Sequence, residues 1–375
     1  MKNYWQEVKL GDICEYSRNR ISISEVNLCN YVSTENLLKE RAGKTIADTI
    51  PEQANLCEYN KGCTLISNIR PYFKKIWFAN TRGGCSNDVL VYKPNNGIND
   101  KWLYYLLSQD SFFNFVMSGT KGTKMPRGDK SQIMKFPVAL PPLDEQRKIA
   151  GVLSAFDDKI ELNNKINRNL EAQAQAIFKS WFIDFEPFKN GKFIDSELGK
   201  IPEGWDIGTI GDISIISTGK RPDKKSVNKS NETPIPIIGA SSIMGYTNKV
   251  LYDEKILITG RVGTHGIIQK IDSPCWPSDN TLVLRSKNLN FLHNCLLLIN
   301  WKSMNRGSTQ PLITQNDLKN IRIILPQDGI IQNYEQLVHY FDIKFHNNNK
   351  EIYSLSQIRD LLLPKLMSGE VNISD

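Results

Sequence analysis

Two long stretches of the chain carry apolar residues at alternating three- and four-residue steps. In the first stretch these positions include Ile149, Leu153, Phe156, Ile160 and Leu170, and in the second Val338, Phe341, Phe345, Leu355 and Leu362. This spacing is typical of the a/d seam of a coiled coil. It predicts two long helical segments, 143–188 and 327–369. The first helix should end at about Phe182 and the second at about Leu366. Each helix would be roughly 55–65 Å long at about 1.5 Å per residue.

The rest of the chain has a mixed pattern with short β-type runs. These runs include CTLISNI, VLVYK, KILITG and TLVLR, and they are separated by glycine, proline, asparagine and aspartate. Such punctuation is typical of short strands joined by turns. We predict strand-rich globular domains over residues 1–142 and 205–326, a linker over 189–204 and a tail over 370–375.

A ten-residue segment occurs twice, as FDDKIELNNK at 156–165 and as FDIKFHNNNK at 341–350. The two globular parts also begin alike, with WQEVKLGDI at 5–13 and WDIGTIGDI at 205–213, while their middles match only faintly. Self-similarity over such a distance indicates one module present twice. We therefore predict an α+β fold with a pseudo-two-fold internal repeat. Two similar globular domains would be separated by two long helices that form an antiparallel coiled coil.

Two asparagines occupy equivalent a positions in the two predicted helices. They are Asn163 and Asn348, inside the shared Asn-Asn-Lys sequence. A buried asparagine at an a position lowers stability but fixes register, because it pairs best with another asparagine. We expect the two amides to meet near the middle of an antiparallel seam; the alternative is that both face solvent on independent helices.

Composition places the chain in a broad class without choosing its activity. The 375 residues are 40% hydrophobic and 23% charged, as in a soluble globular protein of two or more domains. No apolar run approaches the ~20 residues that span a bilayer, and the first residues lack the apolar core of a secretion signal. We therefore expect a cytoplasmic protein. The net charge of +7 favours a polyanionic partner only weakly.

Motifs for catalysis and metal binding are weak. Residues 42–45, AGKT, end like a phosphate-binding loop, but position 38, where its first glycine should be, is leucine. Asp223 and Asp253, each near lysine, match a Mg²⁺-dependent nuclease only superficially. No Gly-x-Gly occurs, so a Gly-rich dinucleotide loop is missing, and the seven cysteines form no CxxC pair. We predict no catalytic residue and no metal site.

Basic and polar loops lie in the diverged middles of both domains. Arginine can read guanine, asparagine and glutamine can read adenine, and lysine holds phosphates. Two such domains at a fixed separation would read two DNA half-sites about one turn, ~34 Å, apart. The candidate DNA-binding residues are Arg70, Lys74, Lys75, Lys124 and Arg127 in the first domain, and Lys220, Arg221, Lys224, Arg261, Thr264, Arg306 and Gln310 in the second.

Taken together, these motifs resemble the specificity (S) subunits of type I restriction-modification enzymes over essentially the whole chain. The resemblance rests on the repeated W…LGDI start and on the helical segment at 140–188, which begins LPPLDEQRKIAGVLSAFDDKI. It also rests on the ending IRDLLLPKLMSGEV at 358–371 and on the loops GRVGTHG and GSTQP.

The resemblance implies a non-catalytic DNA-binding subunit with two target-recognition domains. Each domain would read half of a bipartite, asymmetric sequence in double-stranded DNA, and the paired helices would set the spacer between the halves. Two methyltransferase (modification) subunits would dock on the helices, and restriction or motor subunits would join them. S-adenosylmethionine, ATP and Mg²⁺ would then be bound by those partners and not by this chain.

Two readings of other classes stay open from the residues alone. The first is a scaffold that uses the helices to space two protein-binding domains and binds no DNA. The second is a solitary nuclease that would depend on Asp223 or Asp253. Salt sensitivity separates the first from a DNA-binding subunit, because contacts from several lysines and arginines to phosphates weaken as ionic strength rises.

Overall fold

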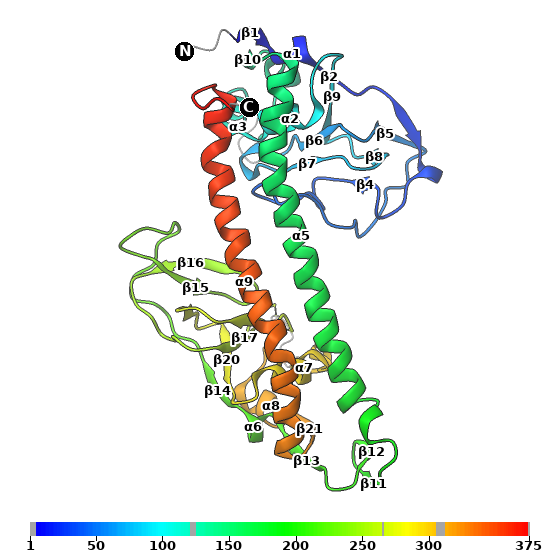
Figure 1. The fold of residues 1–375 in the computed structure, drawn as a ribbon, viewed down its shortest axis with the longest axis vertical. Coiled ribbons are helices and arrows are strands. Elements are labelled where there is room, and N and C mark those ends of the chain that lie inside the picture. Colours follow the sequence, from blue (N-terminus) through cyan, green and yellow to red (C-terminus); the bar gives the residue numbers. More distant parts are fainter. Residues whose placement is uncertain (1–4, 121–124, 265, 305–311, 374–375) are drawn as a thin grey trace. The chain divides into compact units, whose positions relative to one another are not determined.

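The computed structural model describes residues 5–120, 125–264, 266–304 and 312–373. The chain divides into two compact units, the first formed by Met1–Asn164 with Asn349–Asp375 and the second by Lys165–Asn348. Two 40-residue helices, α5 (Leu143–Phe182) and α9 (Asp328–Met367), each contribute one part to either unit (Figure 1). Both predicted helices are thus confirmed, at about 60 Å each.

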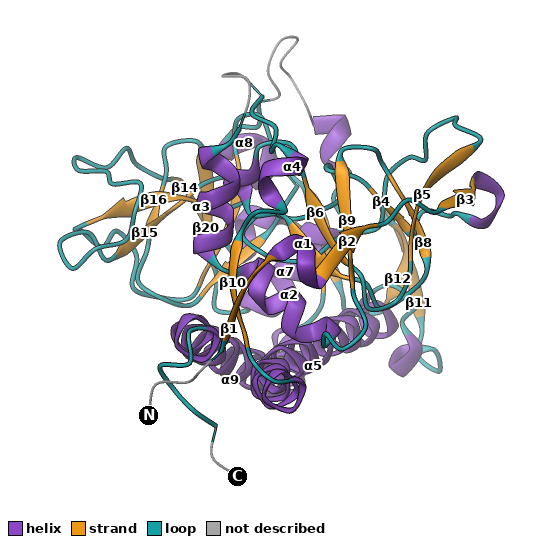
Figure 2. Ribbon diagram, turned by 90° about the horizontal axis from the view of Figure 1, so that it is seen from above, coloured by secondary structure: helices purple, strands orange, loops and turns teal. Residues whose placement is uncertain are grey.

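Among its described residues, the first unit contains two four-stranded sheets and one pair of short strands, β1 and β10. One sheet has the order β2–β9–β6–β7 and the other β3–β5–β8–β4, with β3, β5 and β8 visible side by side in Figure 2. The strands are β1 (Gln6–Lys9), β2 (Cys14–Tyr16), β3 (Arg20–Ser22), β4 (Tyr31–Val32), β5 (Asn55–Tyr59), β6 (Thr64–Ser67), β7 (Ile76–Phe78), β8 (Gly83–Cys85), β9 (Val89–Pro94) and β10 (Pro137–Leu140).

Helices close the core of the first unit. They are α1 (Leu10–Ile13), α2 (Asp100–Ser108), α3 (Asp110–Ser118) and α4 (Lys130–Ile133), followed by the first part of α5. Trp102 on α2 and Phe112 on α3 are fully buried, and they share one core with Leu153 of α5 and Leu366 of α9. The long helices are therefore part of the core of this unit.

The second unit repeats this plan. Its four-stranded sheet has the order β14–β20–β17–β18, and a smaller sheet has the order β16–β15–β19. Its elements are β11 (Phe193–Ser196), β12 (Gly199–Pro202), β13 (Asp206–Thr209), α6 (Ile210–Ile213), β14 (Ile215–Thr218), β15 (Ile235–Ile238), β16 (Ile243–Thr247), β17 (Ile256–Gly260), β18 (Gln269–Ile271), β19 (Trp276–Pro277), β20 (Thr281–Arg285), α7 (Leu289–Leu297), α8 (Gln315–Lys319) and β21 (Arg322–Leu325).

The repeated Gly-Asp-Ile motif has the same structural role in both units. Asp12 and Asp212 accept hydrogen bonds from the backbone N–H groups of Lys9 (2.8 Å) and Thr209 (2.7 Å), so a carboxylate caps the start of α1 and of α6. A Cβ on Gly211 would lie 2.4 Å from the Lys319 side chain, so only glycine fits without a shift. The shared residues thus start each unit in the same way.

The two long helices run antiparallel within each unit. In the first unit Asp157 is paired with Arg359 at 2.6 Å, whereas Asn163, further along α5, donates to Glu351, which comes earlier on α9. In the second unit Tyr334 donates to the Ala174 carbonyl at 3.4 Å.

The predicted seam residues lie on the inner faces of the helices. Ile149, Leu153 and Val338 are buried, and Phe156, Ile160, Leu170, Phe341, Phe345, Leu355 and Leu362 are half-buried.

The expected pairing of Asn163 with Asn348 is wrong, although both side chains are buried as predicted. The Asn163 amide donates to Glu351 at 2.8 Å, and the Asn348 amide donates to Asn167 at 2.8 Å. The antiparallel register places each asparagine opposite a residue other than its sequence equivalent. The amides still satisfy the requirement that buried polar groups be hydrogen-bonded.

Within the part of the chain that the structure describes, no helix combines the length and the apolar character needed to cross a membrane.

Candidate nucleic-acid interface

In the first unit two loops meet at the end of the central strand β6. The N–H of Asn68 donates to the Asp88 carbonyl at 2.8 Å, and the N–H of Gly128 donates to the Asn68 carbonyl at 3.3 Å. Arg127 forms an isolated antiparallel bridge with Ile69. The backbone therefore fixes the loop that follows β6 against the loop that precedes α4.

The second unit builds the same junction with other residues. The N–H of Arg261 donates to the Asn280 carbonyl at 2.8 Å, the N–H of Ile313 donates to the Arg261 carbonyl at 3.0 Å, and Val262 is bridged to Leu312. The strand registers, Leu65 opposite Val91 and Ile258 opposite Val283, put the two junctions in the same place in each sheet.

The strand pairing also shows which residues of the two units occupy equivalent positions. Arg261 occupies the position of Asn68, which the sequence analysis did not single out, and Arg70 occupies the position of Gly263. Sequence comparison at a constant offset misses this pair, because the two middles differ in length. The weak match of CSNDVLVYK with PSDNTLVLR was the signal that could have found it.

Arg70 and Arg127 lie at the first junction. Arg70 is half-buried in a left-handed conformation with φ 50°, and its buried Nε has no hydrogen-bond partner among the described residues. Arg127 pairs with Asp88 at 3.2 Å, and both side chains are largely exposed. An exposed ion pair contributes little to stability, so a phosphate or a base can take the place of Asp88 at small cost.

The two lysines after Arg70 are held by the fold. Lys74 pairs with Asp110 at 2.9 Å, and Asp110 also accepts from Arg41. Lys75 donates to the Thr34 carbonyl, and burial lowers the pKa of Lys75. These contacts attach the loop that carries both lysines to α3, which begins at Asp110, and to the segment that follows β4.

The basic loop of the second unit is mostly exposed. Lys220, Arg221 and Lys224 are all exposed, and Lys224 pairs with Glu232 at 3.0 Å. Asp223, the nuclease candidate, accepts from Lys249 at 2.7 Å, and this lysine lowers the pKa of Asp223.

A polar hollow lies beside Arg261. It is lined by Thr218, Arg261, Thr314, Gln315 and Asn316, and Thr264 is exposed nearby in sequence. A Cβ on Gly260 would lie 1.7 Å from the Thr264 carbonyl oxygen, so glycine permits this tight loop. The hollow offers one cationic and several amide or hydroxyl groups, which are the groups that read base edges. The candidates Lys124, Arg306 and Gln310 lie outside the described residues.

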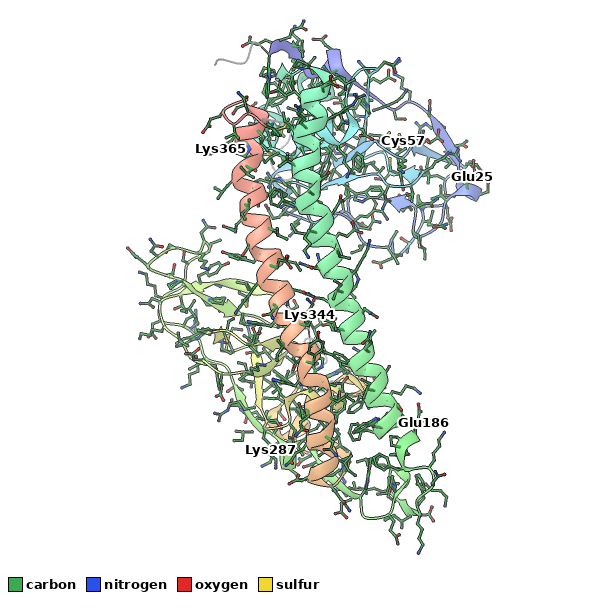
Figure 3. The ribbon with its side chains drawn as sticks, in the orientation of Figure 1. Glu25, Cys57, Glu186, Lys287, Lys344 and Lys365 are labelled. Atoms are coloured by element: carbon green, nitrogen blue, oxygen red, sulfur yellow. The ribbon has the colours of Figure 1, made fainter. Side chains whose placement is uncertain are left out.

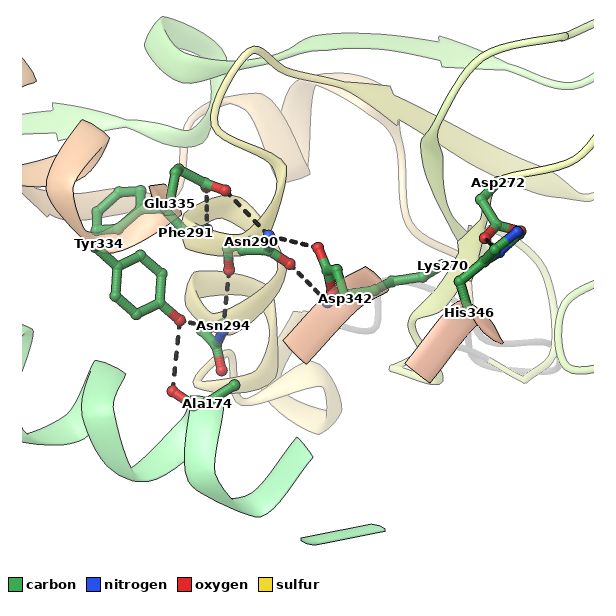
Figure 4. A network of polar contacts seen from close by, with 10 residues as sticks. All are labelled: Ala174, Lys270, Asp272, Asn290, Phe291, Asn294, Tyr334, Glu335, Asp342 and His346. Atoms are coloured by element: carbon green, nitrogen blue, oxygen red, sulfur yellow. Dashed lines mark hydrogen bonds and ion pairs between the residues drawn. The ribbon is translucent and has the colours of Figure 1, made fainter. Parts of the chain in front are cut away.

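The repeated Phe-Asp sequence attaches each globular part to a long helix, a role that sequence reasoning missed. In the first unit the Tyr105 hydroxyl donates to Asp157 at 2.6 Å. In the second unit Asn290 donates to the equivalent Asp342 at 2.7 Å, and Lys270 pairs with Asp342 at 3.4 Å (Figure 4). In each unit a carboxylate on a long helix therefore holds the globular part against that helix.

Further polar contacts in Figure 4 fix α7 against α9. Glu335 accepts from the backbone N–H of Phe291 at 2.8 Å and from Asn290 at 3.0 Å, which satisfies donors at the start of α7. Burial raises the pKa of Glu335. Asn294 donates to the Tyr334 hydroxyl at 3.0 Å.

Acidification is expected to destabilise the second unit through His293. Burial and the nearby Lys270 lower the pKa of His293 to about 3, whereas Asp342 acts in the opposite direction. The unfolded state then binds more protons below pH ~6.5, so stability falls as pH drops, by about 2 kcal/mol at pH 5. Urea unfolding at pH 7 and pH 5 measures this change. His293→Gln should remove this loss of stability at pH 5, whereas His339→Gln should not, because His339 is exposed on α9. An equal pH dependence of stability in both variants would contradict the assignment of this effect to His293.

The described residues contain no group of three or more His, Cys, Asp or Glu side chains placed to hold a metal ion. The loop at 42–45, whose sequence ends like a phosphate-binding loop, is fixed by contacts of Lys44 within the fold. The Lys44 amino group donates to the Cys29 carbonyl at 2.7 Å and lies 5.0 Å from the centre of the Trp77 ring.

Comparison with known proteins agrees with this arrangement. A family model described as "Type I restriction modification DNA specificity domain" matches residues 2–172 and 202–356, once in each copy of the module. The MjaIX specificity subunit of a type I restriction enzyme from Methanocaldococcus jannaschii is 30% identical, over 94% of this chain and 87% of its own length. The HindI specificity subunit from Haemophilus influenzae is 24% identical, over 98% and 99%.

A solved structure shares the fold. The S subunit of a type I restriction-modification system from M. genitalium matches with a TM-score of 0.56 at 17% identity, covering 98% of this chain and 97% of that one. The predicted fold class is thereby confirmed. This chain belongs to the family of type I restriction-modification DNA specificity domains and is a non-catalytic specificity subunit, whose general role is DNA sequence recognition.

Proposed function

We propose that this chain reads a bipartite, asymmetric sequence in double-stranded DNA, with one half-site bound at each loop junction. The observation that carries the proposal is that the same backbone hydrogen bonds build the junction twice, around different side chains. Asn68 stands where the second unit has Arg261. Asparagine can form paired hydrogen bonds with adenine, and arginine can form them with guanine. Two junctions with the same backbone but different side chains would therefore read different half-sites.

The long helices would dock two methyltransferase subunits, and restriction subunits would join that core. Large apolar side chains stay exposed on α9 in the part belonging to each unit. These are Leu337 (46%), Tyr340 (67%) and Ile343 (46%) in the second unit, and Ile358 (45%) and Leu361 (67%) in the first. Exposed apolar groups of this size are typical of protein-binding surfaces. S-adenosylmethionine, ATP and Mg²⁺ would be bound by these partners.

Raising the salt concentration is expected to weaken DNA binding steeply. If the two junctions and their flanking lysines make about six phosphate contacts, the affinity of the complex should fall about 10³-fold between 50 and 200 mM salt. Fluorescence anisotropy with a labelled duplex measures this change. A binding constant that stays constant over this range would favour the scaffold that spaces protein partners.

Two arginines provide a matched test of the interface. Arg127→Gln should weaken binding and reduce the salt slope by about one, because Arg127 lies at the junction. Arg147→Gln, which removes an equally exposed arginine from an ion pair on α5, should leave both unchanged. Equal losses in the two variants would place the DNA elsewhere.

A further inference from the structure

Three cysteines lie close together in the first unit, two of them in the sheet β3–β5–β8–β4 and the third, Cys63, just before β6. Cys57 lies on β5 and Cys85 lies directly opposite it on β8, in antiparallel register. Both pack in one cluster with Cys63, and the position of Cys57 is labelled in Figure 3. Cys85 and Cys63 are buried, whereas Cys57 is partly exposed. A small oxidant can therefore reach the cluster through Cys57.

The strand register suits a bond between Cys57 and Cys85. The N–H groups of Gly84 and Ser86 point to the other neighbour, where they donate to the carbonyls of Asn30 (3.2 Å) and Val32 (2.9 Å). Cys85 therefore faces Cys57 as a hydrogen-bonded pair, in which the Cα atoms are about 5.5 Å apart and the side chains share one face. A disulfide spans Cα separations of about 4.4–6.8 Å.

The surroundings activate Cys57 as the attacking group. A hydrogen bond from Cys85 and the charges of Arg20 and Lys130 lower the pKa of Cys57 to about 7, against the opposing effect of its burial. The same contact and burial raise the pKa of Cys85. Cys57 is therefore more readily deprotonated near neutral pH than an ordinary thiol, and the thiolate is the reactive form.

We propose that Cys57 and Cys85 form a peroxide-reactive dithiol that closes reversibly into a disulfide between β5 and β8. The Cys57 thiolate attacks one peroxide oxygen, the O–O bond breaks, and the leaving hydroxide takes a proton to become water. Cys57 is then a sulfenic acid. The Cys85 sulfur attacks the Cys57 sulfur, and the hydroxyl leaves as a second water with the Cys85 proton. Two thiols lose two electrons to one peroxide, and a dithiol reductant reverses the reaction.

Mass spectrometry of the full chain tests the proposal directly. The chain is treated with a few equivalents of hydrogen peroxide at pH 7 and digested without reduction. The expected product is a peptide pair that joins Cys57 to Cys85, lighter by two hydrogens and separated by dithiothreitol. A Cys57–Cys63 link would overturn the choice of partner, and modification of exposed Cys29 with Cys57 unchanged would overturn the proposal.

Two variants separate the roles of the cysteines. Cys85→Ser should leave Cys57 as a sulfenic acid that dimedone traps, and Cys57→Ser should give neither the disulfide nor the adduct at Cys85. Cys29→Ser is the control and should react like the unaltered chain. Thermal unfolding of each variant verifies folding, and the unaltered chain keeps the test decisive should a variant fail to fold.

Discussion

Exchanging residues 205–326 for the same region of a relative with another specificity is expected to replace one half of the recognised DNA sequence and leave the other half unchanged. The second unit has its own sheets and its own core, which includes Trp205, Phe291 and Tyr334. The ends of the exchanged segment also lie together, because Asp206 is opposite Leu325 in the pairing of β13 with β21. The exchange therefore keeps the two points at which residues 205–326 join the rest of the chain close together.

The reciprocal exchange is the matched control. Residues 6–140 begin and end in the pair β1–β10, where Gln6 lies opposite Leu140. Exchange of this segment should alter only the other half-site. Both variants are assayed by mapping methylated bases in DNA from cells that also express the methyltransferase subunit. A change in both halves after either exchange would show that the two units do not read DNA independently.

Tyr334→Ala is expected to lower the free energy of unfolding by about 3–5 kcal/mol, since it removes a fully buried ring from the core. The ring packs against Phe178 and Phe182 of α5, with centroids 5.9 and 5.2 Å away. Its hydroxyl also accepts from Asn294. Tyr334→Phe keeps the packing and loses the hydrogen bonds, so it should lower stability by about 1 kcal/mol.

A second tyrosine on the same helix controls for the change of residue type. Tyr340 is 67% exposed, so Tyr340→Ala should change stability by less than about 0.5 kcal/mol. Urea unfolding followed by tryptophan fluorescence measures all three variants, because Trp181 and Trp205 belong to this core. Equal losses at both positions would show that α9 is not held against α5 by its inner face.

Local periodicity and repetition were sufficient to predict the long helices and the internal duplication. The three- and four-residue steps through Ile149, Leu153 and Phe156 are a local property of the chain, and the complete or partial burial of these side chains follows from it. The repeated Gly-Asp-Ile marks another local structure, the capped turn at Asp12 and Asp212.

Features that depend on contacts between distant segments were not predictable. The partners of Asn163 and Asn348 depend on the antiparallel register, which a shift of one helical turn changes. The equivalence of Asn68 with Arg261 follows from strand pairing across loops of unequal length. Likewise, the sequence does not distinguish an exposed lysine from one that is hydrogen-bonded within the fold, and only the fold shows that Lys75 donates to the Thr34 carbonyl.

Bipartite recognition is tested by co-expressing this chain with a methyltransferase subunit of a type I system and mapping the methylated adenines in the host DNA. We expect one motif with two unequal halves and an unspecified spacer of fixed length. Absence of any motif, from cells in which the complex of the two subunits can be isolated, would contradict bipartite recognition by this chain.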